Sequence, residues 1–178
     1  MLQRYFAVLF FGLFIFGCLM PLSIYAAESP KTFPYTVGEF EKAINGKVKA
    51  FGVPRWKRVQ TKKHGYVSEH IFGITDRIVG NVTVPQGGKN IGDVLLILYL
   101  RDKDTRPFLQ FLNSFAAIID TLAPEIKPEE RGEVLRDLGL LDGTFPTEQT
   151  TARKGNLAFI FAQLPDNQAM LLLVEPAK

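Results

Sequence analysis

The chain has 178 residues and a formal net charge of +3, and its only cysteine is Cys18. A single cysteine excludes a disulfide within the chain and a metal site built on several thiolates. The roughly 150 residues that follow position 27 are enough to bury one hydrophobic core without such cross-links.

Residues 1–27 have the pattern of a secretory signal peptide. Arg4 supplies a positive start, the run from Tyr5 to Met20 is apolar, and small residues lie before Glu28. This order predicts export and cleavage after Ala26 or Ala27. The apolar run of about 16 residues is shorter than the roughly 20 that span a bilayer, so an uncleaved N-terminal anchor is the alternative. Phe16 occupies the place where lipid attachment to Cys18 would need a small residue.

The first element expected after the leader is a helix. Thr36 and Glu39 have the spacing of a capping box, in which each side chain bonds the backbone of the other residue. Apolar residues then recur at helical spacing, at Val37, Phe40, Ile44, Val48 and Phe51. Gly52 and Pro54 end this helix.

Three strands are expected next, within Tyr66–Thr75, Ile78–Val84 and Asp93–Leu100. The third contains the sequence VLLILYL, which is apolar on both faces, so it predicts a central strand covered by helices on at least one side. Short polar turns separate the three runs, and this favours an antiparallel meander.

Two helices and a hairpin complete the predicted order. Thr105 is expected to cap a helix that ends at Pro124, and Pro128 starts a third helix through Leu138. Leu141–Lys154 is predicted to be a long loop, followed by strands at Leu157–Leu164 and Ala169–Glu175. Residues 28–178 are therefore predicted to form a single α+β domain: one antiparallel sheet of about five strands, with helices packed on one face, in the order α-β-β-β-α-α-β-β.

The sequence PEERGEVLRDLGL, Pro128–Leu140, resembles a segment of small exported bacterial α+β domains of uncharacterised function. The resemblance covers 13 residues of the chain. It implies a secreted bacterial α+β module and carries no catalytic residue across.

The two histidines, His64 and His70, are candidates for a metal or catalytic pair. On one extended strand they lie six residues apart, which is about 20 Å, whereas two ligands of one zinc ion each lie about 2 Å from it. No metal site and no cofactor is therefore expected. The Asp102-Lys103-Asp104 loop has the residue types of a divalent-cation site, but capping and turn formation call for the same residues. No serine lies in a nucleophile elbow.

The strongest functional signal is a basic segment, Gly46–Gly65, which contains seven cations, one tryptophan and no acid. The expected binding residues are Lys47, Lys49, Arg55, Trp56, Lys57, Arg58, Lys62 and Lys63. Cations beside an exposed aromatic ring suit an anionic partner or a membrane interface. The alternative is a solvated linker whose Trp56 and Val59 are tucked into the core.

These patterns predict an exported protein, periplasmic or secreted, that binds a protein partner and is not an enzyme. The sheet face, the loop Leu141–Lys154 and the basic segment are the expected contact regions, and an immunity or inhibitor-type role fits the size and the lack of a cofactor motif. One alternative is an envelope-associated protein that holds anionic lipid or polymer through the basic segment. A second is a hydrolase with an unrecognised site. No nucleic-acid partner is expected, and membrane contact is expected to be peripheral at most after signal cleavage.

Overall fold

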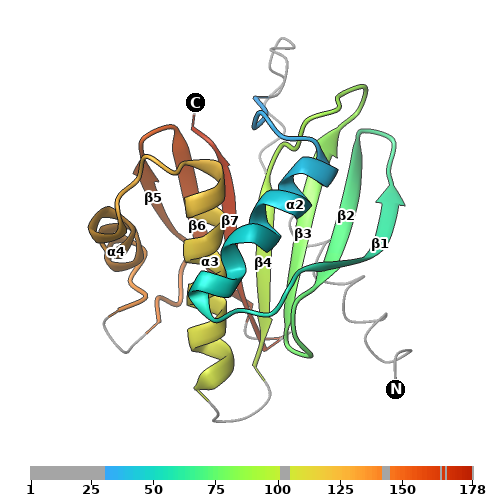
Figure 1. Cartoon of the computed structure of the whole chain (residues 1–178). Helices are drawn as coiled ribbons and strands as arrows, with labels where there is room; N and C mark the ends of the chain where they lie inside the picture. Colours follow the sequence, from blue (N-terminus) through green and yellow to red (C-terminus); the bar gives the residue numbers. More distant parts are fainter. Residues whose placement is uncertain (1–30, 101–104, 142–144, 165, 167, 178) are drawn as a thin grey trace.

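The computed structural model describes residues 31–100, 105–141, 145–164, 166 and 168–177. Within these residues the chain forms one antiparallel sheet of seven strands and three α-helices (Figure 1). The strands are β1 (Lys57–Lys63), β2 (Val67–Gly73), β3 (Ile78–Pro85), β4 (Val94–Tyr99), β5 (Thr150–Lys154), β6 (Leu157–Leu164) and β7 (Ala169–Pro176). The helices are α2 (Val37–Lys47), α3 (Arg106–Leu122) and α4 (Pro128–Asp137), and a 3₁₀ turn, η1 (Val48–Phe51), extends α2.

The mixed α+β class and the single antiparallel sheet are confirmed, but the predicted strand count and element order are wrong. Two strands were missed: β1 lies in the basic segment, and β5 lies inside the predicted loop Leu141–Lys154. Both are edge strands, at the two ends of the sheet. An edge strand has a neighbour on one side only and needs few apolar residues of its own, so its sequence lacks the pattern of a buried strand.

The strand order is β1-β2-β3-β4-β7-β6-β5. The first four strands form the expected meander, and the chain then returns through two helices to build the other half of the sheet. The last strand, β7, lies between β4 and β6, where Leu96 is paired with Leu172 and Val94 with Val174. Residues far apart in the sequence therefore meet in the middle of the sheet.

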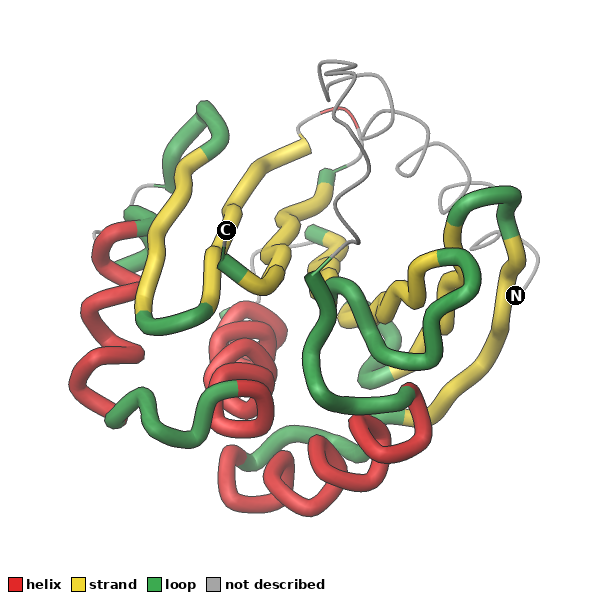
Figure 2. The backbone as a smooth tube through the Cα atoms, turned by 90° about the horizontal axis from the view of Figure 1, so that it is seen from above, coloured by secondary structure: helices red, strands yellow, loops and turns green. Residues whose placement is uncertain are grey.

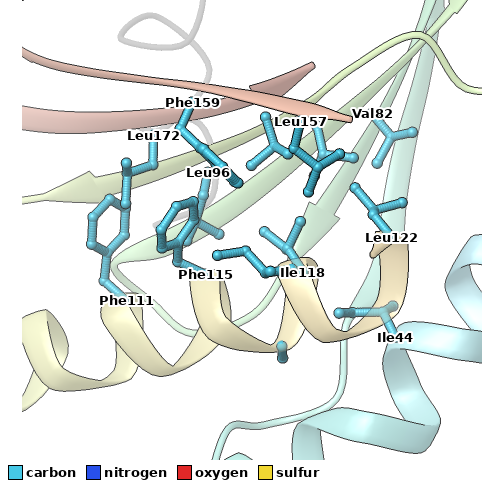
Figure 3. Packing of buried hydrophobic residues seen from close by; sticks show 14 of the residues in the cluster. Ile44, Val82, Leu96, Phe111, Phe115, Ile118, Leu122, Leu157, Phe159 and Leu172 are labelled. Carbon is cyan, nitrogen blue, oxygen red and sulfur yellow. The ribbon is translucent and has the colours of Figure 1, made fainter. Parts of the chain in front are cut away.

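All three helices lie on the same side of the sheet (Figure 2). Helix α3 contributes most of the large apolar side chains that face the strands. The cluster between α3 and the sheet includes Phe111, Phe115, Ile118, Leu122, Leu96, Leu157, Phe159 and Leu172 (Figure 3). The rings of Phe115 and Phe159 meet edge to face, with centroids 5.5 Å apart. This arrangement confirms that the apolar β4 strand is covered by helices on one face.

The helix ends only partly follow the sequence expectation. The capping box of α2 is present: the Thr36 hydroxyl accepts from the Glu39 backbone N–H, and the Glu39 carboxylate accepts from the Thr36 N–H at 2.8 Å. Thr105 stands at the N-cap of α3, but its side chain makes no capping bond, which corrects the prediction. Its backbone is helical (φ −82°, ψ −15°), whereas a capping residue is normally extended.

Trp56 is buried beneath α2, with 1% of its surface exposed. Its ring lies between those of Phe40 and Phe72, at centroid distances of 5.9 and 5.8 Å. Asn45 fixes the backbone at this point, because its side-chain amide donates to the Trp56 carbonyl and its oxygen accepts from the Trp56 N–H. A Cβ added at Gly80 would lie 2.5 Å from the indole, so only glycine leaves room for the ring there.

Candidate functional site

The face of the sheet turned away from the three helices, here called the far face, is largely apolar. Because side chains alternate along a strand, the odd-numbered residues of β4 and β7 lie on this face and the even-numbered ones on the helix side. Ile97, Ala169 and Leu171 form a second buried cluster there, and Leu95, Tyr99 and Leu164 pack against it. Cross-strand pairing places Ile71 of β2, Leu173 of β7 and Ile160 of β6 on the same face, so apolar side chains lie in rows that run across the strands.

Several far-face residues are buried as deeply as residues of the core. Ile71 is 2% exposed, Leu171 5% and Ile97 7%. None of the described helices lies on this side of the sheet (Figure 2). Apolar residues on a side of the sheet that no described helix covers are typical of a contact between protein segments.

Three carboxylates cross one end of the far face. Glu69 on β2 is paired with Thr83 on β3, and the Thr83 backbone N–H donates to the Asp93 carbonyl. Asp93 immediately precedes Val94, which is paired with Val174, so Asp93 lies opposite Glu175. The strand register thus brings residues 69, 93 and 175 into one line, which we call the acidic row.

The surroundings of Asp93, in the acidic row, disfavour the negative charge of its carboxylate. Burial raises the pKa of the Asp93 carboxyl to about 6, and repulsion from Glu175 and Glu69 adds to the rise, whereas the hydrogen bond with Thr83 opposes it. Among the described residues no ion pair joins Asp93 or Glu175 to a cation. A positive group brought to this row would relieve the repulsion.

Two buried acceptors near the row also lack donors. The side chains of Asn81 and Glu69 are 3% and 4% exposed, and neither Asn81 Oδ1 nor Glu69 Oε2 has a hydrogen-bond partner among the described residues. Glu69 Oε2 has His64 Nε2 at 3.4 Å, which is an ion pair only when the imidazole is protonated. Buried acceptors without donors are costly, so this end of the far face is suited to a ligand that donates.

The basic segment is not gathered into one patch. Lys47, at the end of α2, bonds Asp120 of α3 at 2.9 Å, and Arg58, on β1, contacts Glu41 of α2 at 3.3 Å. Strand β1 then carries Lys62 and Lys63 along the edge of the sheet, away from the end of α2 (Figure 1). The remaining cations, Lys49, Arg55 and Lys57, are exposed.

The expectation of an exposed aromatic among these cations is wrong for Trp56, because the ring fills the space between α2 and Gly80. The alternative interpretation was right about Trp56 and wrong about Val59, which is 66% exposed. The register between β1 and β2 shifts between Arg58 and Gln60, and Val59 lies within this irregularity.

The two histidines contact different partners. His64 pairs with Glu69, and Nδ1 of His70 lies 3.2 Å from the Thr61 hydroxyl. Burial, and secondarily the positive charge of Arg58, lower the pKa of His70. Within the described part of the chain no group of three or more His, Cys, Asp or Glu residues is arranged to hold a metal ion. The Asp102–Asp104 candidate lies outside the described residues.

Two carboxylates of α4 link this helix to the sheet. Glu130 and Glu133 of α4 both contact Lys154 on β5, at 3.1 and 3.0 Å. The hydrogen bond from the Lys127 backbone N–H, and secondarily the contact with Lys154, lower the pKa of the Glu130 carboxyl. The two contacts with Lys154 tie the α4 helix to the edge of the sheet.

Comparison with known proteins gives no relative. No protein-family model, no curated protein and no solved structure matches this chain. Among the described helices, none combines the length and apolar character needed to cross a membrane. The geometry of the far face is therefore the basis for the functional argument.

Proposed function

We propose that this chain is an exported, non-enzymatic binding protein that recognises a protein partner through the far face of its sheet. The observation that carries the proposal is the composition of this face: apolar rows on the central strands end in three carboxylates, two of which, Asp93 and Glu175, have no ion pair among the described residues. Apolar surface supplies most of the free energy of association, and charged groups at its border supply specificity. An immunity or inhibitor-type role is one form that such binding can take.

The far face supports this role better than the basic segment does. A site for anionic lipid or polymer was expected to combine several free cations with an inserting aromatic ring. Trp56 is buried, and Lys47 and Arg58 are paired with Asp120 and Glu41. The far face, in contrast, brings its apolar and charged groups together across five strands.

Site-specific photo-crosslinking in the native cell envelope tests the proposal. A photoreactive amino acid at Ile160, on the far face, is expected to form a covalent adduct with one recurring protein that mass spectrometry identifies. The matched control places the same amino acid at Leu109, an exposed apolar position on α3. Adding Leu95→Glu to the Ile160 probe is expected to abolish the adduct, because it puts a charge into the apolar rows.

A second control separates the two candidate surfaces. The double substitution Arg55→Ala and Lys57→Ala removes two exposed cations and is expected to leave the Ile160 adduct unchanged. Adducts that form equally from Leu109, or that vanish with the double substitution, would show that the far face is not the recognition surface.

A further inference from the structure

We propose that the outer edge of β1 binds an extended, acidic segment of another protein, which adds to the seven-stranded sheet as an eighth strand. This edge is a different surface from the far face, so the contact is additional to the proposed function. Extended segments commonly bind in this way: main-chain hydrogen bonds supply affinity, and the side chains that alternate along the strand supply specificity.

Strand β1 leaves backbone groups unpaired, because it is the first strand in the order of the sheet and has a neighbour on one side only. In an antiparallel pair, residues that bond the neighbouring strand alternate with residues whose N–H and C=O groups point away from it. The His64 N–H donates to the Val67 carbonyl at 2.8 Å, and this bond fixes the alternation between β1 and β2. The N–H and C=O groups of Thr61 and Lys63 therefore point outward, and no backbone hydrogen bond is made to them by the described residues.

The irregularity of β1 leaves this part of the edge intact. The register against β2 shifts between Arg58 and Gln60, whereas Gln60–Lys63 pairs regularly with residues 68–71. Bulges and lysines are devices by which edge strands resist pairing with other chains. Because the shift is confined to one half of β1, the other half keeps two donors and two acceptors in regular positions for an added strand.

The side chains of β1 select the charge of that strand. Its sequence, KRVQTKK, has four cations and no acid. Lys57 and Lys63, at its two ends, are exposed. Opposite charges on neighbouring strands stabilise the pair, and like charges facing each other destabilise it. A segment that carries Asp or Glu against these lysines is therefore favoured over a neutral or basic one.

The two ends of the sheet differ in how far they are covered. Five of the seven residues of β1 are exposed, and Val59 in the middle of the strand is 66% exposed. At the other end α4 packs beside β5, where Lys154 contacts Glu130 and Glu133 (Figure 1). Among the described elements none lies beyond β1, so this end is the one open to a further strand.

A second copy of the chain and the chain's own leader fit β1 less well. Pairing two copies of β1 would bring four cations of one strand against four of the other. Residues 1–27 contain Arg4 and no Asp or Glu, so the leader offers no opposite charge either. An acidic segment of another protein satisfies both the outward backbone groups and the lysines.

The test measures the affinity of the purified protein for two synthetic peptides of eight residues. Both have valine or threonine at every second position; the positions between are glutamate in one peptide and lysine in the other. Fluorescence anisotropy at pH 7.5 and low salt, where exposed charges are little screened, is expected to show binding at least tenfold tighter for the glutamate peptide. Hydrogen exchange is expected to show the amides of Thr61 and Lys63 exchanging freely before this peptide is added and protected after it is bound.

A proline substitution separates backbone pairing from simple charge attraction. The Thr61 N–H points away from β2, so Thr61→Pro removes a donor for the added strand and no hydrogen bond of the sheet itself. It is expected to weaken binding of the glutamate peptide at least fivefold. Thr61→Val is the matched control: it also loses the hydroxyl that contacts His70 but keeps the N–H, and it is expected to leave the affinity unchanged.

A charge reversal tests the selection of an acidic segment. Lys63→Glu is expected to reduce the preference for the glutamate peptide at least fivefold. Arg153→Glu, the matched reversal of an exposed cation on β5, is expected to leave it unchanged. Circular dichroism confirms that each variant is folded, and the Lys63 variant and the hydrogen exchange serve if Thr61→Pro does not fold.

Four results would overturn the inference: equal affinity for the two peptides, no binding of either, a preference that survives Lys63→Glu, or binding by folded Thr61→Pro as tight as by Thr61→Val. Amides of Thr61 and Lys63 that are protected before any peptide is added would identify a second copy or the leader as the occupant, and this would overturn it as well. The proposed function stands apart from these results, because the Ile160 crosslink probes the far face.

Discussion

The two faces of the sheet are built from the same strands but carry different side chains. On the helix side, Leu96, Phe159 and Leu172 meet α3, and the cluster there contains apolar residues. On the far side, neighbouring residues of the same strands form apolar rows that end in Glu69, Asp93 and Glu175. A core face needs only apolar packing, whereas a recognition face also needs groups that discriminate between partners. For the binding function proposed above, the carboxylates are the groups that would discriminate between partners.

The largest difference in stability is expected between alanine substitutions at two adjacent leucines of β4, one on each face of the sheet. Leu96→Ala leaves a cavity beneath α3 and is expected to lower the free energy of unfolding by about 2–5 kcal/mol. Leu95→Ala, on the far face, is expected to cost less than about 1.5 kcal/mol, because Leu95 is half-buried and has no described helix above it. Urea denaturation of the two variants measures the difference. Equal losses would mean that the two faces contribute alike to folding.

A smaller effect is expected at Gly80, where the indole of Trp56 occupies the helix side of β3. Gly80→Ala places a Cβ 2.5 Å from the ring and is expected to destabilise the protein by about 1–3 kcal/mol, because the packed indole must shift. Gly46→Ala is the matched control. Gly46 is exposed in α2 with nothing within 4 Å, so alanine there is expected to stabilise by about 0.5–1 kcal/mol. The same sign at both positions in thermal melts would contradict the packing described for Trp56.

The smallest effect is expected from Asp93 and depends on pH. Its pKa in the folded protein is about 6, above the ordinary 3.8, so the folded state holds the proton more tightly than the unfolded state does. Stability from this group is therefore present at low pH and is lost as pH rises from about 4 to 6. The full shift corresponds to about 3 kcal/mol, and solvent screening reduces it to about 1–2 kcal/mol.

Asp93→Asn is accordingly expected to raise the free energy of unfolding by about 1–2 kcal/mol at pH 8 and to leave it almost unchanged at pH 4. Denaturation curves at the two pH values measure this difference, and Asp137→Asn on α4 is the control, with no expected pH-dependent gain. A variant that gains the same stability at both pH values would show that burial of the charged Asp93 carboxylate, with the added repulsion from Glu175 and Glu69, is not the cause.

The sequence was most informative where apolar residues repeat. The periodicity of Phe40 and Ile44 predicted α2, and the VLLILYL run predicted a central strand with helices on at least one side. It failed at β1 and β5, since KRVQTKK and TTARK contain few apolar residues and owe their conformation to pairing with β2 and β6. The missed strands are those whose conformation is set by pairing with a neighbouring strand and not by an apolar pattern in their own sequence.

The candidate site was harder to predict for a related reason. Glu69, Asp93 and Glu175 belong to three strands, and only the register of the folded sheet places them in one row. The sheet face was an expected contact region, but its three carboxylates are far apart in the sequence and form no recognisable motif there. The basic segment, in contrast, was conspicuous in the sequence because its seven cations lie within 20 residues that contain no acid. Lys47 and Arg58 prove to be paired with nearby acids, and Trp56 belongs to the core.

The position of β7 between β4 and β6 has a consequence for how this sheet is assembled. Until residues 169–176 have been synthesised, the meander β1–β4 and the hairpin β5–β6 have no strand to join them. Pairing over such long stretches of chain delays folding. Shortening the polypeptide by its last ten residues would remove β7 and leave the meander and the hairpin without a shared strand, so the sheet can close only after the β7 segment has left the ribosome.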